Sequence, residues 1–407
     1  MTHSDANDQV AAADRKTSRR DWVLLPLISL LTISLLAIGT ELIARSFFTS
    51  KGTLAACEIL NDPLGQHGVP DSACKAKLPE SSMIEYKFNR CGHRSGLECG
   101  RKSDGSYRIV TTGASAVMGF GVRQEDDFSE LLTTKLSRLT GRRIEVYNSA
   151  FAVHYGGTPR VIAQRFNDLL GPKPDMILWS FGPNDVEFSS ILTVQDNIPI
   201  EKAHTSLMTT ILRLRESVGG FTPQAMGRAA HIISEHTFST LMLQHYLYES
   251  QSIYVEHFLM ADDEEQGFLK SEPSAEWRSH LQEFDGYAAQ IEGRAKAAGI
   301  PLVAVFVPSR AQAAMISMGK WPAGYDPYNM GEQVRRIITS HGGTYIDILP
   351  GYRTLPNPER EYLPVDGHPN ADGHAMIAAL LAKGLTDGTV PALKAAWAQQ
   401  AAFEQGK

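Results

Sequence analysis

Two segments far apart in this sequence carry side chains that could form a nucleophile and its base. Ser115 comes after a short apolar run and is preceded directly by Gly113 and Ala114. His368 lies near the C-terminus. A serine hydroxyl is a weak nucleophile near neutral pH and needs a base within hydrogen-bond reach. Histidine suits that role because its ordinary pKa lies near physiological pH. The residue types therefore favour covalent attack by Ser115, with His368 as the base.

Two further groups would complete such a site. Asp366 stands two residues before His368 and could orient the imidazole, with Asp347, at the end of the preceding apolar run, as the alternative. Attack on an acyl carbonyl also needs donors aimed at the developing oxyanion. The side-chain amide of Asn184 is one expected donor, and the backbone N–H of Ser115 is a second. This chemistry needs neither a metal nor an organic cofactor, and we expect neither.

The elements that must position these residues alternate between strands and helices from Tyr107 onward. Continuous apolar strands separated by helices are typical of a parallel sheet covered on both faces, so we expect a three-layer α/β fold. In such a sheet the loops that follow the strands open at one edge, where ligands bind. The expected strands are 107–112, 143–148, 176–181, 302–307 and 344–347, and the expected helices are 128–140, 158–170, 326–341 and 370–385.

Each of these segments also has an ordinary structural interpretation. Ser115 could cap the turn that follows it, Asp185 could bond its own loop, and His374 could pack on the C-terminal helix. Arg310 could bind an anionic or sugar group at the cleft, or it could be ion-paired or solvated. The occurrence of three such segments in this order, at strand ends of one sheet, favours a catalytic site.

The segments resemble the sequence blocks of the SGNH hydrolase superfamily, also called the GDSL family. Gly113-Ala114-Ser115 matches the first block except that alanine replaces aspartate, and 117–122 resembles its usual continuation. Gly182-Pro183-Asn184-Asp185 meets the third block, Gly-x-Asn-Asp. The resemblance covers about residues 108–385. It implies an SGNH/flavodoxin-like sheet, with Ser115 as the nucleophile and Asn184 as an oxyanion donor.

The last block of the family usually reads Asp-x-x-His, with both residues in the catalytic triad. His368 matches, and the residues after it continue a common form. Val365 occupies the usual aspartate position, however, and Asp366 lies one residue later. The resemblance therefore implies His368 as the base and leaves Asp366 and Asp347 as the two candidates for the triad acid.

The second block departs further from the family. Family members use a glycine backbone N–H shortly after an asparagine such as Asn148, whereas Gly156 follows here only after a longer interval. We expect Gly156 to supply the third oxyanion donor. The backbone N–H of Val153 or His154 is the alternative.

One stretch near the N-terminus points to a membrane. Residues 22–40 carry no charge over 19 positions, close to the length that a bilayer-spanning helix needs. A cleaved signal peptide and a buried soluble helix are the alternatives, but the length and the charged ends favour an uncleaved anchor. More basic residues precede the stretch than follow it, so we expect the short N-terminus in the cytoplasm and the rest outside. These residues are Arg15, Lys16, Arg19 and Arg20 before it, and Arg45 and Lys51 after it.

The four cysteines favour the same compartment. They lie together between residues 57 and 99, and an even cluster in an oxidising compartment favours disulfides. We expect Cys57–Cys74 and Cys91–Cys99, because these pairs close the shortest loops. A zinc site with His67 or His93 is the alternative, but the chain has no Cys-x-x-Cys spacing.

The expected organisation is a cytoplasmic tail (1–21), a transmembrane anchor (22–45), a Cys-containing irregular connector (46–106) and a hydrolase domain (107–385). A helical insert interrupts the domain at about 189–300, and a tail helix ends the chain (386–407). The net charge of −6 and the dispersed basic residues give no reason to expect nucleic acid.

Three functions fit these features. The first is an extracytoplasmic esterase whose substrate is an acyl ester, with an envelope carbohydrate as the expected alcohol; the family resemblance implies this substrate. The second is an acyltransferase that modifies an exopolysaccharide, and the third is a catalytically silent binding protein. Labelling by a fluorophosphonate separates the third from the other two.

Overall fold

The computed structural model describes residues 19–59, 62–150, 157–189, 237–260 and 266–395. Its centre is a five-stranded sheet in which all neighbouring strands are parallel, in the order β10-β9-β8-β6-β7. Numbered from the first strand of the sheet, this is the flavodoxin-like order 2-1-3-4-5, in which ligands bind between the first and third strands. The expected fold class is confirmed. The strands are β6 (Tyr107–Thr112), β7 (Ile144–Asn148), β8 (Met176–Phe181), β9 (Leu302–Phe306) and β10 (Thr344–Ile346).

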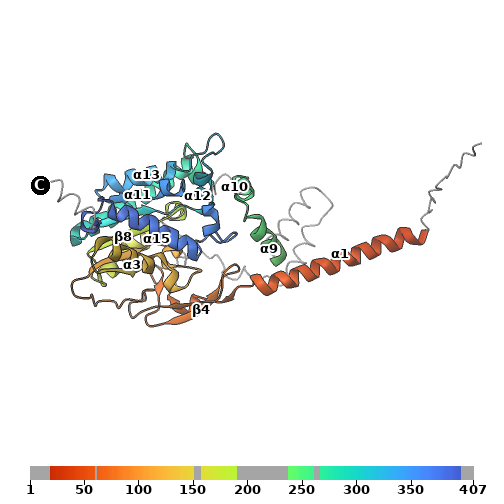
Figure 1. Ribbon diagram of the computed structural model, residues 1–407, viewed down its shortest axis with the longest axis horizontal. Coiled ribbons are helices and arrows are strands. Elements are labelled where there is room, and N and C mark those ends of the chain that lie inside the picture. The colour runs from red at the N-terminus through yellow and green to blue at the C-terminus, as the bar shows by residue number, and fades with distance from the viewer. Residues whose placement is uncertain (1–18, 60–61, 151–156, 190–236, 261–265, 396–407) are drawn as a thin grey trace, which may run out of the picture.

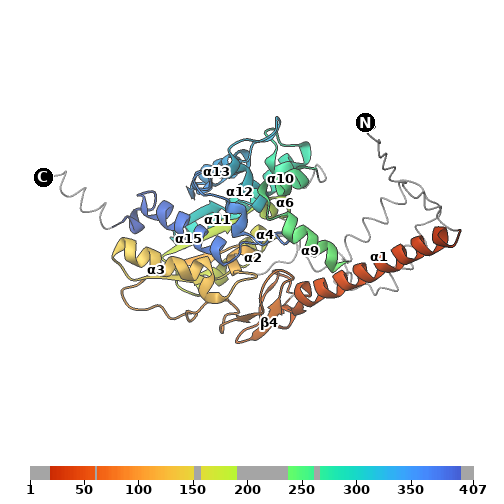
Figure 2. The same ribbon diagram turned by 45° about the vertical axis from the view of Figure 1, so that its right-hand side comes forward.

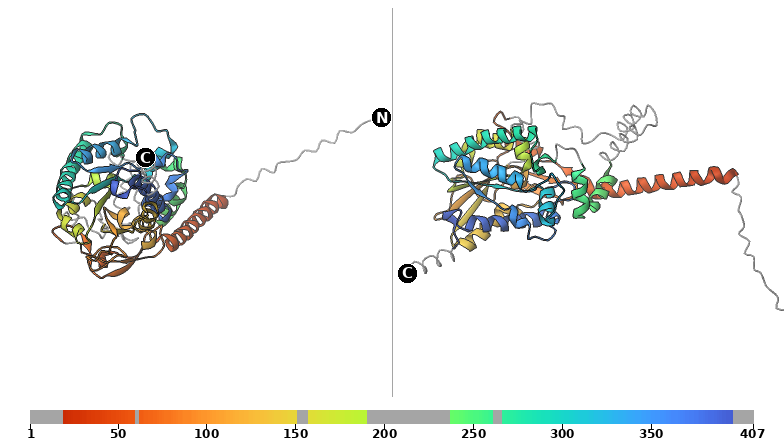
Figure 3. Two further views of the ribbon diagram at one scale, coloured as in Figure 1. Left: turned by 60° about the vertical axis from the view of Figure 1, so that its left-hand side comes forward. Right: turned by 90° about the horizontal axis from the view of Figure 1, so that it is seen from above.

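Helices cover both faces of this sheet, as the right-hand view of Figure 3 shows. One layer holds α3 (Phe128–Thr140) and α15 (Ala371–Thr386), which pack on each other. The other layer holds α11 (Ala275–Ala298), which packs on α4 (Thr158–Gln164), α6 (Pro183–Glu187) and α13 (Asn329–Ser340). The strands lie between these layers and are almost entirely buried, which is why they read as continuous apolar runs. The remaining helical elements of the domain are α5 (Phe166–Leu170), α12 (Arg310–Met318), α14 (Leu349–Tyr352), η2 (Gln124–Asp126), η4 (Gly267–Leu269) and η5 (Pro358–Glu361).

The end of the expected insert belongs to the sheet. Phe284 of α11 is fully buried and packs on Trp179 and Phe181 of β8, with ring centroids 5.4 and 5.0 Å apart. This helix therefore covers the sheet before β9, and only the chain before it lies outside the α/β layers. In that part the structure describes α9 (Phe238–Leu247) and α10 (Gln251–Leu259), and residues 190–236 lie outside the described residues.

The expected irregular connector contains two small antiparallel sheets. One has the order β1-β4-β5, with β1 (Lys51–Gly52), β4 (Ala73–Lys77) and β5 (Ile84–Lys87). The other pairs β2 (Glu58–Ile59) with β3 (His67–Gly68), after the short helix η1 (Ala55–Cys57). Alternation of buried and exposed residues in β5, a signal of a half-buried strand, marks this sheet in the sequence.

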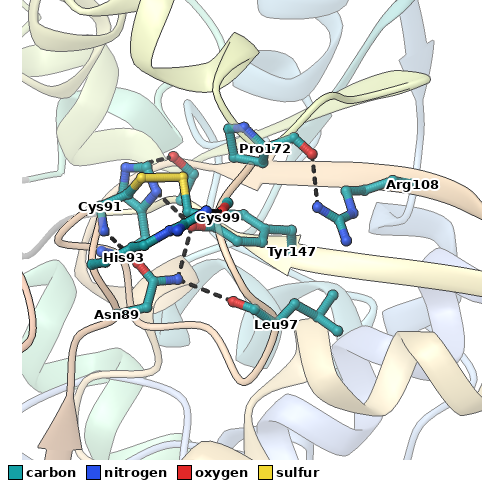
Figure 4. Close-up of a disulfide and its surroundings, with 10 residues drawn as sticks. Asn89, Cys91, His93, Leu97, Cys99, Arg108, Tyr147 and Pro172 are labelled. Carbon is teal, nitrogen blue, oxygen red and sulfur yellow. Dashed lines mark hydrogen bonds between the residues drawn. A yellow bond between two sulfur atoms is a disulfide. The ribbon is translucent and has the colours of Figure 1, made fainter. Parts of the chain in front are cut away.

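Both expected disulfides, Cys57–Cys74 and Cys91–Cys99, are present. The loop closed by the second one is held to the main sheet by Asn89, which donates to the hydroxyl of Tyr147 in β7 (2.8 Å; Figure 4). His93 contacts the same hydroxyl through Nδ1 (2.9 Å). Burial lowers the pKa of His93 to about 4, so the ring is neutral at physiological pH. The disulfides thus close a layer that packs on the α/β domain.

A long apolar helix, α1 (Arg19–Phe48), projects from the body (Figures 1 and 2). Its stretch Trp22–Phe48 is long and apolar enough to cross a membrane, and the 18-residue window that meets this criterion is not buried in the protein. The helix joins the body without a loose linker, because Lys77 of β4 donates to the carbonyl of Phe47 (2.7 Å). Glu41 accepts from the first two backbone N–H groups of α9, those of Phe238 (3.3 Å) and Ser239 (2.9 Å). The last turns of α1 are thereby fixed to both β4 and α9.

The expected C-terminal tail helix does not begin within the described residues. After α15 the chain forms the short helix η6 (Pro391–Leu393), and Leu393 is fully buried against the core. Proline and the buried leucine fix this segment to the domain, in place of a surface helix. Residues 396–407 lie outside the described part of the chain.

Candidate active site

The turn that carries Ser115 is shaped by the close approach of two strands. Gly113 follows β6 with φ +155°, and a Cβ atom there would lie 2.2 Å from the carbonyl oxygen of Ser180 in β8. Only glycine fits this position. The chain then enters the short helix α2 (Ser115–Met118), so Ser115 stands at a helix start beside the point where the strand order reverses. The first N–H groups of a helix lack partners within it, so the backbone N–H of Ser115 is suited to bind an anion.

Ser115, His368 and Asp366 form a continuous series of hydrogen bonds. The hydroxyl oxygen of Ser115 lies 2.7 Å from Nε2 of His368, and Nδ1 of the same ring lies 2.6 Å from Oδ1 of Asp366. The structure thus brings the expected nucleophile and base within hydrogen-bond reach. The ring is also packed edge-on against Phe120, from the loop after α2.

Asp366, rather than Asp347, contacts the imidazole. Burial raises the pKa of Asp366, but the hydrogen bonds and charge of His368 outweigh it, and the pKa lies below its ordinary value. The carboxyl is therefore ionised at neutral pH and can stabilise an imidazolium. Asp347 instead caps its own turn by accepting from the backbone N–H of Leu349 (3.1 Å).

These groups line a cavity of about 260 Å³ at the carboxyl edge of the sheet. Ser115, His368 and Asp366 form one wall, and Asn184, at the start of α6 after β8, forms another. The Asn184 side chain makes no hydrogen bond within the described part of the chain and is exposed to the cavity opening. Its amide is therefore available to a ligand. Tyr254 of α10 also lines the cavity, so the inserted chain contributes to the site.

Gly156 and its alternatives, Val153 and His154, lie outside the described residues. Asn148, which begins the second block, is buried and bonds the loops around it. Its amide donates to the carbonyl of Val117 and to the carboxyl of Asp127, both at 2.7 Å. This asparagine therefore joins the helix α2, which carries Ser115, to the start of α3.

Several residues have the structural roles weighed from the sequence. His374 is fully buried on α15 and accepts from the backbone N–H of Phe128 (3.1 Å), so it is a packing residue. Arg310 lines the cavity, but its guanidinium donates to the carbonyls of Pro364 and Tyr248 and lies 3.9 Å from the ring centroid of Tyr254. It therefore binds the loop before Asp366 to the inserted helices.

No pattern in the sequence indicates the role of Arg94 in the connector. This residue is 1% exposed, and its guanidinium donates to the carbonyls of Met118 (2.9 Å), Gly119 and Val122 (2.7 Å). Tyr86 of β5 accepts from the backbone N–H of Gly121 (2.9 Å). The layer before the domain thus fixes the loop after α2. Because the partners are backbone groups, no pairing of side chains in the sequence could reveal these contacts.

Asp185 bonds its own loop. Its carboxyl accepts from the backbone N–H of Gly182 (2.8 Å) inside the protein. Burial raises the pKa of Asp185 to about 6, and the hydrogen bond from Gly182 offsets only part of this effect. Because the folded state binds this proton more tightly than the unfolded state, Asp185 favours folding at low pH. Its contribution falls as the pH rises from about 4 through 6.

We expect Asp185→Asn to remove this dependence. The amide oxygen can still accept from Gly182, but asparagine does not ionise. The difference between wild type and variant in the free energy of unfolding should change by about 2 kcal/mol between pH 4 and pH 7, with the variant favoured at pH 7. Urea unfolding at both pH values measures it. Identical pH profiles for the two proteins would show that the buried carboxyl does not titrate in this range.

Comparison with known proteins gives matches among solved structures. No family model matches the chain, and no curated protein matches it. Among solved structures, the chain is similar to TesA (12% identity, 70% of this chain and 99% of that chain, TM-score 0.36). It is also similar to Axe2, an acetylxylan esterase from Geobacillus stearothermophilus (14% identity, 70% and 96%, TM-score 0.37). A two-domain esterase active on acetylated mannans has 12% identity, 69% and 49% coverage and a TM-score of 0.34. With identities and TM-scores this low, we base the function on the side-chain geometry.

Proposed function

We propose that this protein is a membrane-anchored serine esterase of SGNH type that hydrolyses O-acyl esters outside the cytoplasm. The observation that carries the proposal is the hydrogen-bonded series from Ser115 through His368 to Asp366 on the wall of a cavity. A nucleophile, a base and an orienting carboxylate in this order are what covalent acyl transfer requires.

In the proposed reaction, Nε2 of His368 takes the proton of Ser115 as the serine oxygen attacks the acyl carbonyl. The ionised Asp366 stabilises the imidazolium, and the amide of Asn184 and the backbone N–H of Ser115 stabilise the oxyanion. His368 then gives the proton to the leaving alcohol, and an acyl-enzyme remains. Water, activated by the same imidazole, attacks the acyl-enzyme and releases the acid.

Other features of the chain support the proposed location and substrate. The apolar helix α1 supports a single membrane anchor. The excess of basic residues before it and the two disulfides after it support an extracytoplasmic domain, periplasmic in a Gram-negative cell. The resemblance to SGNH enzymes supports an O-acylated envelope carbohydrate as the substrate.

The full-length protein in detergent or lipid nanodiscs tests the reaction. We expect a fluorophosphonate to label the protein, and acetylated sugars to release acetate to water. Release that depends on an added sugar acceptor would instead identify an acyltransferase. A folded protein that neither labels nor releases acid would identify a catalytically silent binding protein.

Asn184→Ala should lower kcat by about 10²–10³-fold, because it removes one donor to the oxyanion. KM should change little, since the bond strengthens only as charge develops on the oxygen. Steady-state hydrolysis of an acetyl ester measures both constants. Asn184→Gln keeps the amide on a longer side chain and tests whether the position of the amide matters. An unchanged kcat in the alanine variant would remove Asn184 from the site.

A further inference from the structure

The loop that carries Asp366 is bound by a carboxylate from outside the α/β domain. Glu80 lies between β4 and β5, in the layer that precedes the domain, and its side chain is fully buried (0% exposed). Its Oε2 accepts from the backbone N–H groups of Val365 (2.9 Å) and Asp366 (2.8 Å). A buried carboxylate is retained only where donors compensate for its lost hydration. Here two of those donors belong to the triad loop itself.

A third donor comes from α9. Nδ1 of His245 lies 2.7 Å from Oε1 of Glu80, and the histidine ring packs edge-on against Phe48 at the end of α1, with centroids 5.2 Å apart. Both carboxylate oxygens therefore have partners. A continuous series of contacts runs from the end of the apolar helix through His245 and Glu80 to the backbone of Asp366.

The rest of the loop explains why this contact affects the catalytic pair. Between Leu363 and His368 the chain closes a tight turn, in which Leu363 donates to the carbonyl of His368 (2.8 Å) and Gly367 donates to that of Leu363 (3.0 Å). Glu80 holds the outer side of this turn. The position of the Asp366 backbone sets whether its carboxyl reaches the imidazole, and a displacement of about 1 Å at a reacting group can cost about 10²-fold in rate.

We propose that Glu80 is a positioning residue for the His368–Asp366 pair, and that His245 holds the Glu80 carboxylate in place. The inference deepens the proposed function and rests on it. Glu80 touches neither the nucleophile nor the imidazole, so it acts through the loop. The carboxylate of Glu80 thereby joins three parts of the protein: the end of α1, the layer that holds β4 and β5, and the turn between Leu363 and His368.

The experiment compares Glu80→Ala and Glu80→Gln in the full-length protein. We expect Glu80→Ala to lower kcat by about 10–100-fold, with KM within about twofold of wild type. Glu80→Gln keeps an oxygen that accepts from the loop and should recover most of kcat. His245→Ala should give an intermediate loss, since one of three donors is removed. Glu85→Gln on β5 alters an exposed carboxylate of the same layer and is the matched control, with wild-type constants expected.

Rates are expressed per folded protein, measured by the unfolding transition of each variant. If the wild type is labelled by a fluorophosphonate and Glu80→Ala keeps its kcat, the role of Glu80 is wrong while the proposed function stands. The same conclusion follows if Glu80→Gln recovers stability but not kcat. If the wild type is neither labelled nor active, the proposed function fails, and the inference fails with it.

Discussion

Ser115→Ala should abolish both ester hydrolysis and labelling by a fluorophosphonate, with a loss in kcat of at least about 10⁴-fold. The hydroxyl is the only group of the series that can form the acyl-enzyme, and its oxygen lies 2.7 Å from Nε2 of His368. The side chain is small and partly exposed, so the unfolding transition should hardly change. Initial rates and gel fluorescence after labelling measure the two effects.

Ser180→Ala is the matched control. Ser180 lines the same cavity from the end of β8 but is buried, and no hydrogen bond joins it to His368 among the described residues. This variant should keep its labelling and most of its activity. Labelling that survives in Ser115→Ala, or that vanishes in Ser180→Ala instead, would assign the nucleophile to another residue.

Asp366→Asn has the second largest expected effect, a fall in kcat of about 10²–10⁴-fold. Oδ1 of Asp366 lies 2.6 Å from Nδ1 of His368 and holds the proton of the ring on that nitrogen, which leaves Nε2 free to accept from Ser115. An amide at this position can donate to Nδ1 and so favour the tautomer with a proton on Nε2. That tautomer cannot act as a base. The ratio of kcat values, measured where both proteins are folded, gives the size of the effect.

Asp347→Asn provides the comparison, because the sequence leaves both aspartates as candidates for the triad acid. Asp347 accepts from the backbone of its own turn and does not line the cavity. We expect the kcat of the Asp347→Asn variant to lie within about threefold of the wild-type value, a change that is small compared with the loss of a triad member. Loss of activity in Asp347→Asn with full activity in Asp366→Asn would reverse the assignment.

The sheet could be predicted from the sequence because its strands are buried on both faces. A short apolar run between helices, such as 176–181, indicates a buried strand. The strands lie within one residue of their expected ends. Ser115, Asn184 and His368 could be found because each follows a strand of this sheet or stands before a helix. A parallel sheet brings such loops to one edge, whatever their separation in the sequence.

The supports of the site could not be predicted in this way. Arg94 and Glu80 act on backbone carbonyl and N–H groups, which every residue offers, so no pattern of side chains marks their partners. Both belong to the stretch expected as an irregular connector. The place of α11 was also missed, because an amphipathic helix has the same periodicity whether it covers a sheet or belongs to an insert.

The joint between α1 and the body has a consequence for where the proposed esterase would act. Lys77 binds the last turn of the helix, and Glu41 binds the start of α9, so α1 is joined to the body by direct side-chain contacts. If α1 spans a bilayer as proposed, the mouth of the cavity would keep a nearly constant height above the lipid headgroups. The body would then turn mainly about the axis of α1. A polymer emerging from the same membrane would pass this fixed height during export, whereas acyl groups far out in the envelope would remain beyond its reach.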